Sequence, residues 1–480
     1  MAKQYTRRDF LRNGIASGLA LAAAPDPWHQ PFAANRSEPD MGALRALARK
    51  LKGRVIFPGD AGYEALRRVW NFRFDRRPAA IARCLTADDL ARLVDFARKN
   101  DTLVAVRSGG HSQSGFSVCD GGIVIDLSGM KSIVVDAKRR IARAQPGLTR
   151  GEFERATVQY GLTTAMGQCQ DVGIGGLTLG GGEGVLSGLY GAACDNVGAI
   201  EIVTADGSIR RANARENPDL LWGTCGGAGN LGAVTVFEYR LYSVDEVVAG
   251  WTWYPLSAAR EVMQRYRDFT RTVPDSLFSE FSVQRPDGKE LLAGVFVFHS
   301  EPARAGKDLA PLDKFGPTIR SSIKKRPYLE GQASAGFPVV WGMSSYQRSG
   351  FVPELTDELI AAVTGNPPPE DADLWFAHLH GAISRRPIDA NVYPQRRPGF
   401  TYWAEADWNG RTPQKAIAWV DRLWSQSKGY TSGVYVNMLD GEPDRTRETY
   451  GPNYERLATL KRKYDPSNFF RMNQNVQPAA

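Results

Sequence analysis

The chain has 480 residues, enough for two or more domains with sizeable cores, and its 42% hydrophobic and 23% charged residues are ordinary for a soluble globular protein. The net charge of +8 comes from 60 basic and 52 acidic side chains that are scattered along the chain. Because nucleic-acid binding calls for a concentrated basic stripe with a recognition motif, we expect no nucleic-acid partner.

The first 35 residues have the organisation of a bacterial export signal. Thr6–Arg12 contains paired arginines, Ile15–Ala24 is weakly apolar, and the small residues Ala22–Ala24 suit a cleavage site. This order is typical of a twin-arginine signal, so residues 1–35 are expected to be signal peptide and linker. We therefore expect the twin-arginine machinery as a partner and a periplasmic or secreted protein. The apolar stretch is shorter than the roughly 20 residues of a membrane-spanning helix, so no permanent anchor is expected.

The first half of the chain predicts short strands mixed with helices. Leu85–Leu90 has the features of a helix start, because Thr86 can cap the helix while Asp88 and Asp89 complement its dipole. A second helix is expected from Gly151 to about Gly161. Alternating apolar residues predict strands at 103–106, 123–127, 132–136, 141–145, 199–204, 208–211 and 233–239.

Two glycine-rich segments place a potential nucleophile inside a tight loop. Arg107–Ser112 contains His111, and Gly167–Gly176 contains Cys169. Because glycine has no side chain, such a loop can approach a flat ligand closely and adopt a positive φ. The loops therefore favour a flat ligand held against backbone, although an imidazole and a thiol by themselves identify no chemistry.

A third glycine-rich segment, Gly227–Gly232, matches the GxGxxG pattern of dinucleotide-binding loops. In a Rossmann fold a helix follows this loop, whereas here the pattern predicts a strand at 233–239. Bare backbone N–H groups in this segment and in Gly173–Gly184 can still bind a pyrophosphate. The sequence thus favours a dinucleotide but argues against a Rossmann fold.

Beyond about Val244 the sequence changes to longer, aromatic-rich segments, for example Trp251–Tyr254, Leu291–Phe298 and Phe400–Trp403. These segments fit an antiparallel sheet with helices alongside it.

The five cysteines give no sign of paired spacing, and four of them, Cys84, Cys119, Cys194 and Cys225, are expected to be packing residues. We expect no metal site, because His and Cys do not occur at zinc-ligand spacing.

Several motifs in order resemble the berberine-bridge-enzyme-like flavoproteins of the vanillyl-alcohol oxidase superfamily. They are the two nucleophile loops together with Gly175–Gly182, Asp195–Val197, Asn217–Trp222, Gly226–Gly232, Tyr435–Asn437, Tyr450–Tyr454 and Lys463–Arg471. The resemblance implies an α+β fold with a PCMH-type FAD-binding domain at 70–244. A substrate-binding domain with an antiparallel sheet flanked by helices would occupy 245–430. A berberine-bridge module at 431–480 would pack back on the FAD domain.

The resemblance also implies a covalent FAD, attached through an 8α-histidyl bond from His111 and a 6-cysteinyl bond from Cys169. Without the resemblance, His111 would be an ordinary turn histidine and Cys169 a small buried hydrophobe. The other residues expected to bind the cofactor are Arg107, Ser108, Gly109, Gly110, Ser112, Gly115, Val172, Gly173, Gly175, Gly176, Gly182, Val197 and Asn473.

Substrate oxidation needs a base near the flavin, and the Tyr-x-Asn motif of related microbial oxidases maps to Tyr435, with Asn437 placed to touch flavin or substrate. A tyrosine would need a cationic or second phenolic neighbour to act at neutral pH. The alternative is that Tyr435 is an aromatic strand residue. Glu405 and Asp407 are reserve candidates, and exposed charges are an equal alternative for them.

The expected function is oxidation of an alcohol of a small-molecule substrate, either a sugar or oligosaccharide or an aromatic metabolite. Val172 occupies the position that gates oxygen in the resembling family, where valine is permissive, so O2 is the expected electron acceptor and H2O2 the product. The alternatives are a dehydrogenase that uses another acceptor, and an exported ligand-binding protein without turnover.

Overall fold

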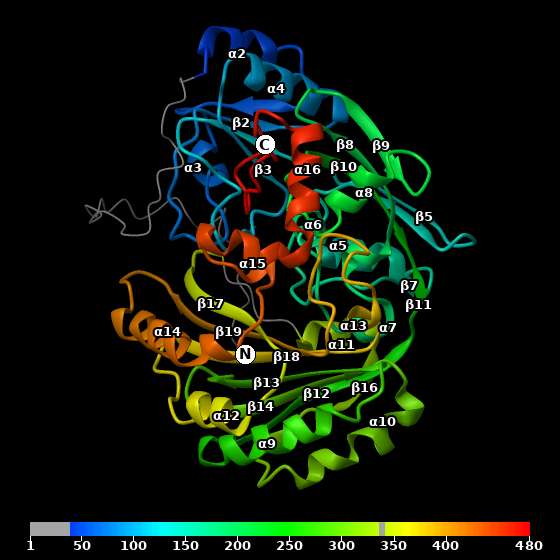
Figure 1. The fold of residues 1–480 in the computed structure, drawn as a ribbon, viewed down its shortest axis with the longest axis vertical. Coiled ribbons are helices and arrows are strands. Elements are labelled where there is room, and N and C mark those ends of the chain that lie inside the picture. The colour runs from blue at the N-terminus through cyan, green and yellow to red at the C-terminus, as the bar shows by residue number, and fades with distance from the viewer. Residues whose placement is uncertain (1–38, 336–340) are drawn as a thin grey trace.

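The computed structural model of the chain describes residues 39–335 and 341–480, so the expected export signal at 1–35 lies outside the described residues. Figure 1 shows an upper half built from the earlier part of the chain and a lower half built around one large sheet. In the described part of the chain, no helix is long and apolar enough to cross a membrane.

The first sheet of the upper half has the order β1-β2-β4-β3, with β2 and β3 parallel to β4 and β1 antiparallel to β2. Helix α4 (Ala87–Lys99) begins as expected, with Thr86 and Asp89 forming a reciprocal capping box. Strand β3 feeds directly into the His111 loop. The other elements of this region are α2 (Met41–Ala48), β1 (Arg54–Ile56), α3 (Tyr63–Leu66), β2 (Ala80–Arg83), β3 (Val104–Arg107) and β4 (Ile123–Asp126).

The second sheet is antiparallel, with the order β5-β6-β10-β8-β9. Strand β10 follows the Gly227–Gly232 loop directly, which confirms that this GxGxxG segment does not open a Rossmann helix. The elements are β5 (Ile133–Asp136), β6 (Ile141–Ala144), α5 (Arg150–Val158), β7 (Leu162–Thr163), α6 (Ile174–Leu179), α7 (Ser187–Tyr190), β8 (Val197–Val203), β9 (Ile209–Asn213), α8 (Pro218–Thr224), β10 (Ala233–Arg240) and β11 (Tyr242–Ser243).

The lower half contains an eight-stranded sheet in which every recorded pairing is antiparallel, as expected from the aromatic segments. Its main path is β15-β12-β14-β13-β18-β19-β17, and β16 pairs with β12. The strands are β12 (Glu246–Pro255), β13 (Leu277–Gln284), β14 (Leu292–His299), β15 (Arg320–Ser321), β16 (Lys324–Pro327), β17 (Ser344–Val352), β18 (Ala372–Leu379) and β19 (Gly399–Trp408).

Helices cover one face of this sheet (Figure 1), and α11 (Tyr328–Ala335) packs against β12 and β14 on the other face. The helices α9 (Ala259–Thr270), α12 (Asp357–Thr364) and α14 (Gln414–Ser427) share a core cluster with Phe376 and Tyr402. The neighbouring residues Trp375 and Trp403 belong to a different cluster, because successive side chains of a strand point to opposite faces. The second face therefore turns toward the upper half. The α+β architecture agrees with the expected fold class.

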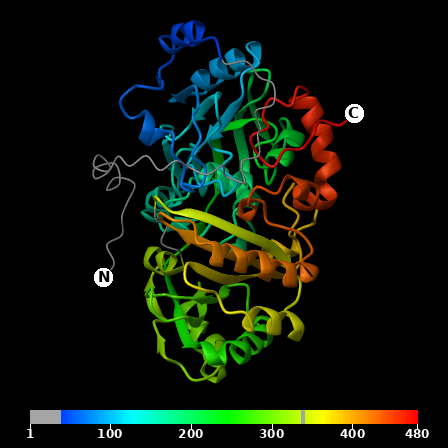
Figure 2. The same ribbon diagram turned by 90° about the vertical axis from the view of Figure 1, so that its left-hand side faces the viewer.

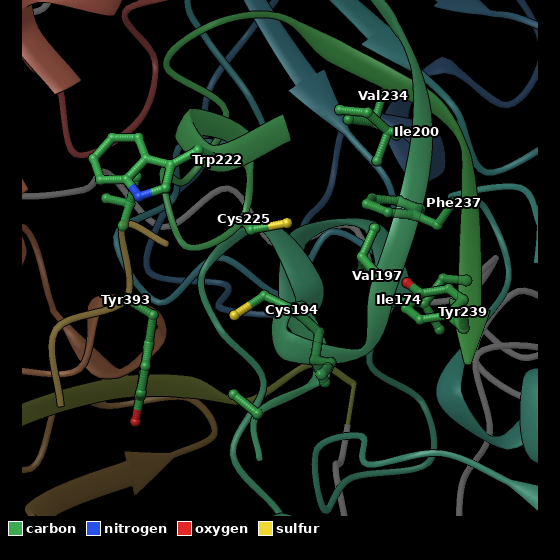
Figure 3. Packing of buried hydrophobic residues seen from close by; sticks show 14 of the residues in the cluster. Ile174, Cys194, Val197, Ile200, Trp222, Cys225, Val234, Phe237, Tyr239 and Tyr393 are labelled. Atoms are coloured by element: carbon green, nitrogen blue, oxygen red, sulfur yellow. The ribbon is translucent and has the colours of Figure 1, made fainter. Parts of the chain in front are cut away.

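The end of the chain returns to the upper half, where Figure 2 shows α16 (Tyr454–Tyr464) lying against it. Tyr450 and Val476 are fully buried in one cluster with Phe237 of β10. Figure 3 shows part of this cluster, in which Trp222 of α8 and Tyr393 also take part. The remaining helices are α10 (Pro302–Leu309), α11 (Tyr328–Ala335), α13 (Ala382–Arg385) and α15 (Thr446–Tyr450).

A buried ion pair fastens this terminal segment. Lys461 and Asp465 are both 0% exposed and lie 2.7 Å apart. The Lys461 ammonium also donates to the carbonyl oxygens of Asn230 at 2.8 Å and Phe470 at 2.6 Å. Burial lowers the pKa of Lys461, and Asp465 opposes that shift. One ammonium group thus ties the glycine loop before β10 to the chain terminus.

We predict that Lys461→Met destabilises the protein by about 3–5 kcal/mol, because it leaves Asp465 as an uncompensated buried charge. The measurement is urea-induced unfolding. The matched control is Lys463→Met, whose lysine is 59% exposed and pairs with Asp219, so its effect should stay within about 1 kcal/mol. Equal unfolding midpoints for the two variants would contradict the anchoring role.

Candidate active site

One cavity of about 410 Å³ lies between the upper half and the face of the large sheet that carries Trp403. Both predicted nucleophiles, His111 and Cys169, line it, as do Tyr435 and Asn437. Of the other predicted cofactor-binding residues, it is lined by Ser108, Gly109, Gly110, Ser112, Val172, Gly173, Gly175, Gly176 and Asn473. The structure therefore gathers most of the predicted site residues, although they come from three distant parts of the chain.

The two nucleophile loops meet backbone to backbone. A Cβ atom added at Gly109 would lie 2.4 Å from the Gly173 nitrogen, and one added at Gly173 would lie 2.4 Å from the Gly109 nitrogen. The Ser108 hydroxyl donates to the Pro146 carbonyl at 2.5 Å and holds the same corner. Glycine is required here for close approach, since Gly173 itself has an ordinary φ of −69°.

The His111 ring lies between two tryptophans. Trp70 stacks on it with ring centroids 5.6 Å apart, and Trp341 meets it edge-on at 5.8 Å. These contacts fix the plane of the imidazole at the cavity wall. Sequence reasoning missed both tryptophans, because nothing in their local sequence marks them as neighbours of a loop so far away in the chain.

Cys169 differs from the other four cysteines in its surroundings. None of the five cysteines, which all lie in the described part of the chain, forms a disulfide. Cys169 is half-buried and faces the cavity, whereas the others are buried. Burial raises the pKa of Cys119 and of Cys225 to about 12, which makes those thiols inert packing residues as expected. Cys169 is thus the one cysteine of the chain in contact with the cavity.

The Tyr435 hydroxyl oxygen accepts three hydrogen bonds. The donors are the backbone N–H groups of Gly182 at 2.9 Å and Glu183 at 3.2 Å, and the Asn437 amide at 2.8 Å. Burial and the charge of Glu183 raise the pKa of Tyr435, while the three donors oppose the shift. Tyr435 precedes the short 3-10 turn Val436–Met438, so the alternative of a strand residue does not hold.

Glu183 is a further cavity residue, which sequence reasoning missed. Its carboxylate accepts hydrogen bonds from the Tyr393 hydroxyl at 2.7 Å and the Thr401 hydroxyl at 2.6 Å. Burial raises the pKa of Glu183 to about 7, and these two hydrogen bonds limit the rise. The available signal was an acidic residue inside an otherwise small and apolar glycine run.

Glu405 and Asp407 line the cavity rather than the outer surface. They stand two residues apart on β19, on the same face as Trp403, because strand side chains alternate. Burial and the neighbouring Asp407 and Asp373 carboxylates raise the pKa of Glu405, while burial raises that of Asp407 to about 6. The sequence left two interpretations of these residues open, reserve candidates for the base or solvent-exposed charges. Their position in the cavity wall excludes the second interpretation.

Four predicted site residues do not line the cavity, and each has a structural role beside it. Arg107 is buried and pairs with Asp126 at 2.8 Å, behind the His111 loop. Gly115 leaves room for the Phe74 ring, and Gly182 offers its N–H to Tyr435. Val197 begins β8 inside the upper core.

The cavity fits the flavin expected from the sequence. A Cβ atom at Gly176 would meet nothing within 4 Å, so this backbone faces open space. The Asn473 side-chain oxygen is buried, and no hydrogen-bond partner within the described chain reaches it. His111 and Cys169 could hold the ring covalently, and the glycine backbone could receive the diphosphate through N–H groups.

We predict that Gly173→Ala costs about 1–3 kcal/mol of stability and weakens flavin retention, because its methyl group would overlap the Gly109 backbone. Thermal unfolding and the visible absorbance of the purified protein measure the two effects. Gly306→Ala in α10 is the control, since a Cβ there meets nothing within 4 Å and should be neutral or slightly stabilising. Identical behaviour of both variants would mean that the loops separate freely.

Two segments of the chain that line this site match known protein families. Residues 78–213 match the FAD binding domain family, and residues 434–477 match the family described as berberine and berberine like. The FAD-binding match covers the His111 and Cys169 loops, and the second match covers Tyr435 and Asn437.

Full-length relatives extend these matches. The chain is 31% identical to (R)-6-hydroxynicotine oxidase of Paenarthrobacter nicotinovorans, over 91% of this chain and 99% of that protein. It is 26% identical to a carbohydrate oxidase of Microdochium nivale, over 91% of this chain and 95% of that one. The crystal structure of 6-hydroxy-D-nicotine oxidase from Arthrobacter nicotinovorans superposes with a TM-score of 0.80 at 30% identity, covering 89% and 98% of the two chains. The protein is therefore an FAD-linked oxidoreductase and belongs to the berberine-bridge-enzyme-like family.

Proposed function

We propose that this enzyme oxidises an alcohol of a small molecule to a carbonyl, with a bicovalently attached FAD, and that O2 takes up the electrons to give H2O2. The observation that carries the proposal is that His111, Cys169 and Glu183 line one cavity. Burial raises the pKa of Glu183 to about 7, which suits a general base at neutral pH. The flavin, when bound, supplies the hydride acceptor. The residues described below supply orientation and proton transfer.

Glu183 is the proposed proton acceptor. A general base works best when its pKa lies near the operating pH, and the pKa of Glu183 is raised to about 7 whereas that of Tyr435 is raised above its usual range. As the carbon loses hydride, the alcohol proton passes to the Glu183 carboxylate. Tyr435 orients the substrate hydroxyl, and Asn437 positions Tyr435 through its amide.

Oxygen as the acceptor is supported by Val172, which is only half-buried and lines the cavity within the Cys169 loop. Two relatives that share most of the chain are named for (R)-6-hydroxynicotine and for carbohydrate, so a small organic molecule is the proposed substrate. Export through the twin-arginine route stays part of the proposal, on the strength of residues 1–35.

Covalent attachment is tested by acid precipitation of the purified protein. We expect a yellow pellet and a colourless supernatant for the wild type, because two bonds hold the flavin. Either His111→Ala or Cys169→Ala alone should leave the pellet yellow, whereas the double variant should release the flavin into the supernatant. Flavin in the wild-type supernatant would refute the covalent attachment while leaving the fold assignment intact.

For Glu183→Gln we expect kcat/KM to fall by roughly 10²–10⁴-fold at neutral pH. In the wild type the rate should rise with pH through about 7, because Glu183 accepts a proton only when ionised and its pKa is raised to that value by burial. The variant should lose this limb of the profile. Flavin reduction without O2 and peroxide release with O2 measure the rate.

Glu358→Gln, at an exposed glutamate of α12, is the matched control and should keep the wild-type profile. If the rise of the rate with pH persists in Glu183→Gln and disappears in Tyr435→Phe, the base is Tyr435 instead.

A further inference from the structure

The cavity is acidic although the whole chain carries a net charge of +8. Glu183, Glu405 and Asp407 line it, and among the described residues no lysine or arginine does. The diphosphate of FAD, when bound, would add further negative charge. A positively charged ligand would favour the ionised form of these carboxylates, whose pKa values burial raises.

Three carboxylates face one another on the sheet that forms this wall. Asp373 of β18 stands directly opposite Glu405 of β19 in the strand register. Asp407 follows two residues later on the same face. Like charges directly opposite each other destabilise a sheet, and the partners of Glu405 and Asp407 on β17 are the neutral residues Gln347 and Ser345. Glu405 and Asp407, which form a cluster with Asp373, thus gain no countercharge from their partners on β17.

The positive charge of Arg285 acts on Asp373, while its guanidinium donates to the carbonyl oxygens of Pro368 and Pro369. Within residues 39–335 and 341–480, neither Glu405 nor Asp407 takes part in an ion pair, and the Asp407 Oδ1 atom is buried without a hydrogen-bond partner. Burial first, and then Asp407, raise the pKa of Asp373 to about 7. A bound cation would relieve both the repulsion and the unpaired oxygen.

The surroundings indicate an organic cation rather than a metal ion. In the described part of the chain, no group of three or more His, Cys, Asp or Glu residues is arranged to hold a metal. Trp403 lines the cavity beside Glu405, and its ring stacks on Trp375 with centroids 5.7 Å apart and 5° between the planes. Aromatic faces next to carboxylates are a favourable environment for an ammonium group with an apolar body.

We propose that the substrate carries a cationic amine, which Glu405 and Asp407 bind at the wall formed by β19. This inference rests on the proposed function, since it uses the same cavity. Thr401, which contacts Glu183, lies four residues before Glu405 on this strand, a separation of roughly 13 Å. The amine is therefore held away from the carbon that is oxidised, and the substrate is an extended molecule.

The test uses matched pairs of benzyl alcohols that carry either an aminoalkyl or a hydroxyalkyl chain in the para position. Binding to the flavin-containing protein is followed as the change in flavin absorbance on titration without O2. We expect the aminoalkyl member of a pair to bind about tenfold or more tightly. N-acetylation of the amine should abolish that preference in the wild-type protein, which makes the test independent of any variant.

In the double variant Glu405→Gln/Asp407→Asn, the ratio of the two affinities within a pair should fall to about one, because the preference for the amine is lost. Glu358→Gln serves again as the control and should keep the preference. Equal binding of both members by the wild type, or an unchanged preference in the double variant, would overturn the inference. Tight binding of cellobiose that is lost in the double variant would also overturn it, because the carboxylates would then serve neutral hydroxyl groups.

The same experiment distinguishes failure of the proposed oxidase function from failure of the cation site. If the aminoalkyl compounds bind preferentially but neither member of any pair reduces the flavin, the cation site stands and the alcohol-oxidase proposal falls. If the hydroxyalkyl compounds reduce the flavin as efficiently as the aminoalkyl compounds and bind as tightly, the oxidase proposal stands and the cation site falls.

Discussion

The site depends on the contact between the backbones of Gly109 and Gly173. A single methyl group on either residue would overlap the other loop, so the contact exists only because both positions are glycine. From this contact His111 and Cys169 extend to the same cavity, although one follows the strand β3 and the other precedes the helix α6. The buried Lys461 holds the terminal segment against the third glycine loop, Gly227–Gly232, through its hydrogen bonds to Asn230 and Phe470.

The two halves of the molecule contribute different chemistry. The upper half offers glycine backbone and nucleophiles, which suit a large flat cofactor with a diphosphate. The eight-stranded sheet offers side chains, and its alternation separates them into two sets. Tyr402 and Phe376 pack under the covering helices, while Trp403, Glu405 and Asp407 face the cavity. A one-residue shift in the register of β19 would exchange these sets, so the register of this strand decides which side chains reach the substrate.

Net charge and local charge disagree in this protein, and the local charge governs the chemistry. Among the described residues, no lysine or arginine lines the cavity. Strand register and loop packing bring three carboxylates to its wall, those of Glu183, Glu405 and Asp407. Burial raises the pKa of Glu183 and of Asp407. The protonation state of these carboxylates therefore affects both the proposed binding of a cation and the proposed proton transfer. Glu183 and the pair Glu405–Asp407 are thus parts of one acidic wall with two proposed roles.

The sequence by itself determined the short-range features. Thr86 and Asp89 specified the start of α4, strand periodicity specified β3 to β6 and β8 to β10, and the ordered glycine motifs pointed to FAD and to the loops of His111 and Cys169. These features depend on residues close together in the chain. Tertiary structure alone decided that Trp70 and Trp341 flank His111, that Glu183 meets Tyr393 and Thr401, and that Glu405 opposes Asp373. The physical reason is that each of these contacts joins segments far apart in sequence, and only strand register and the packing of the two halves bring them within reach.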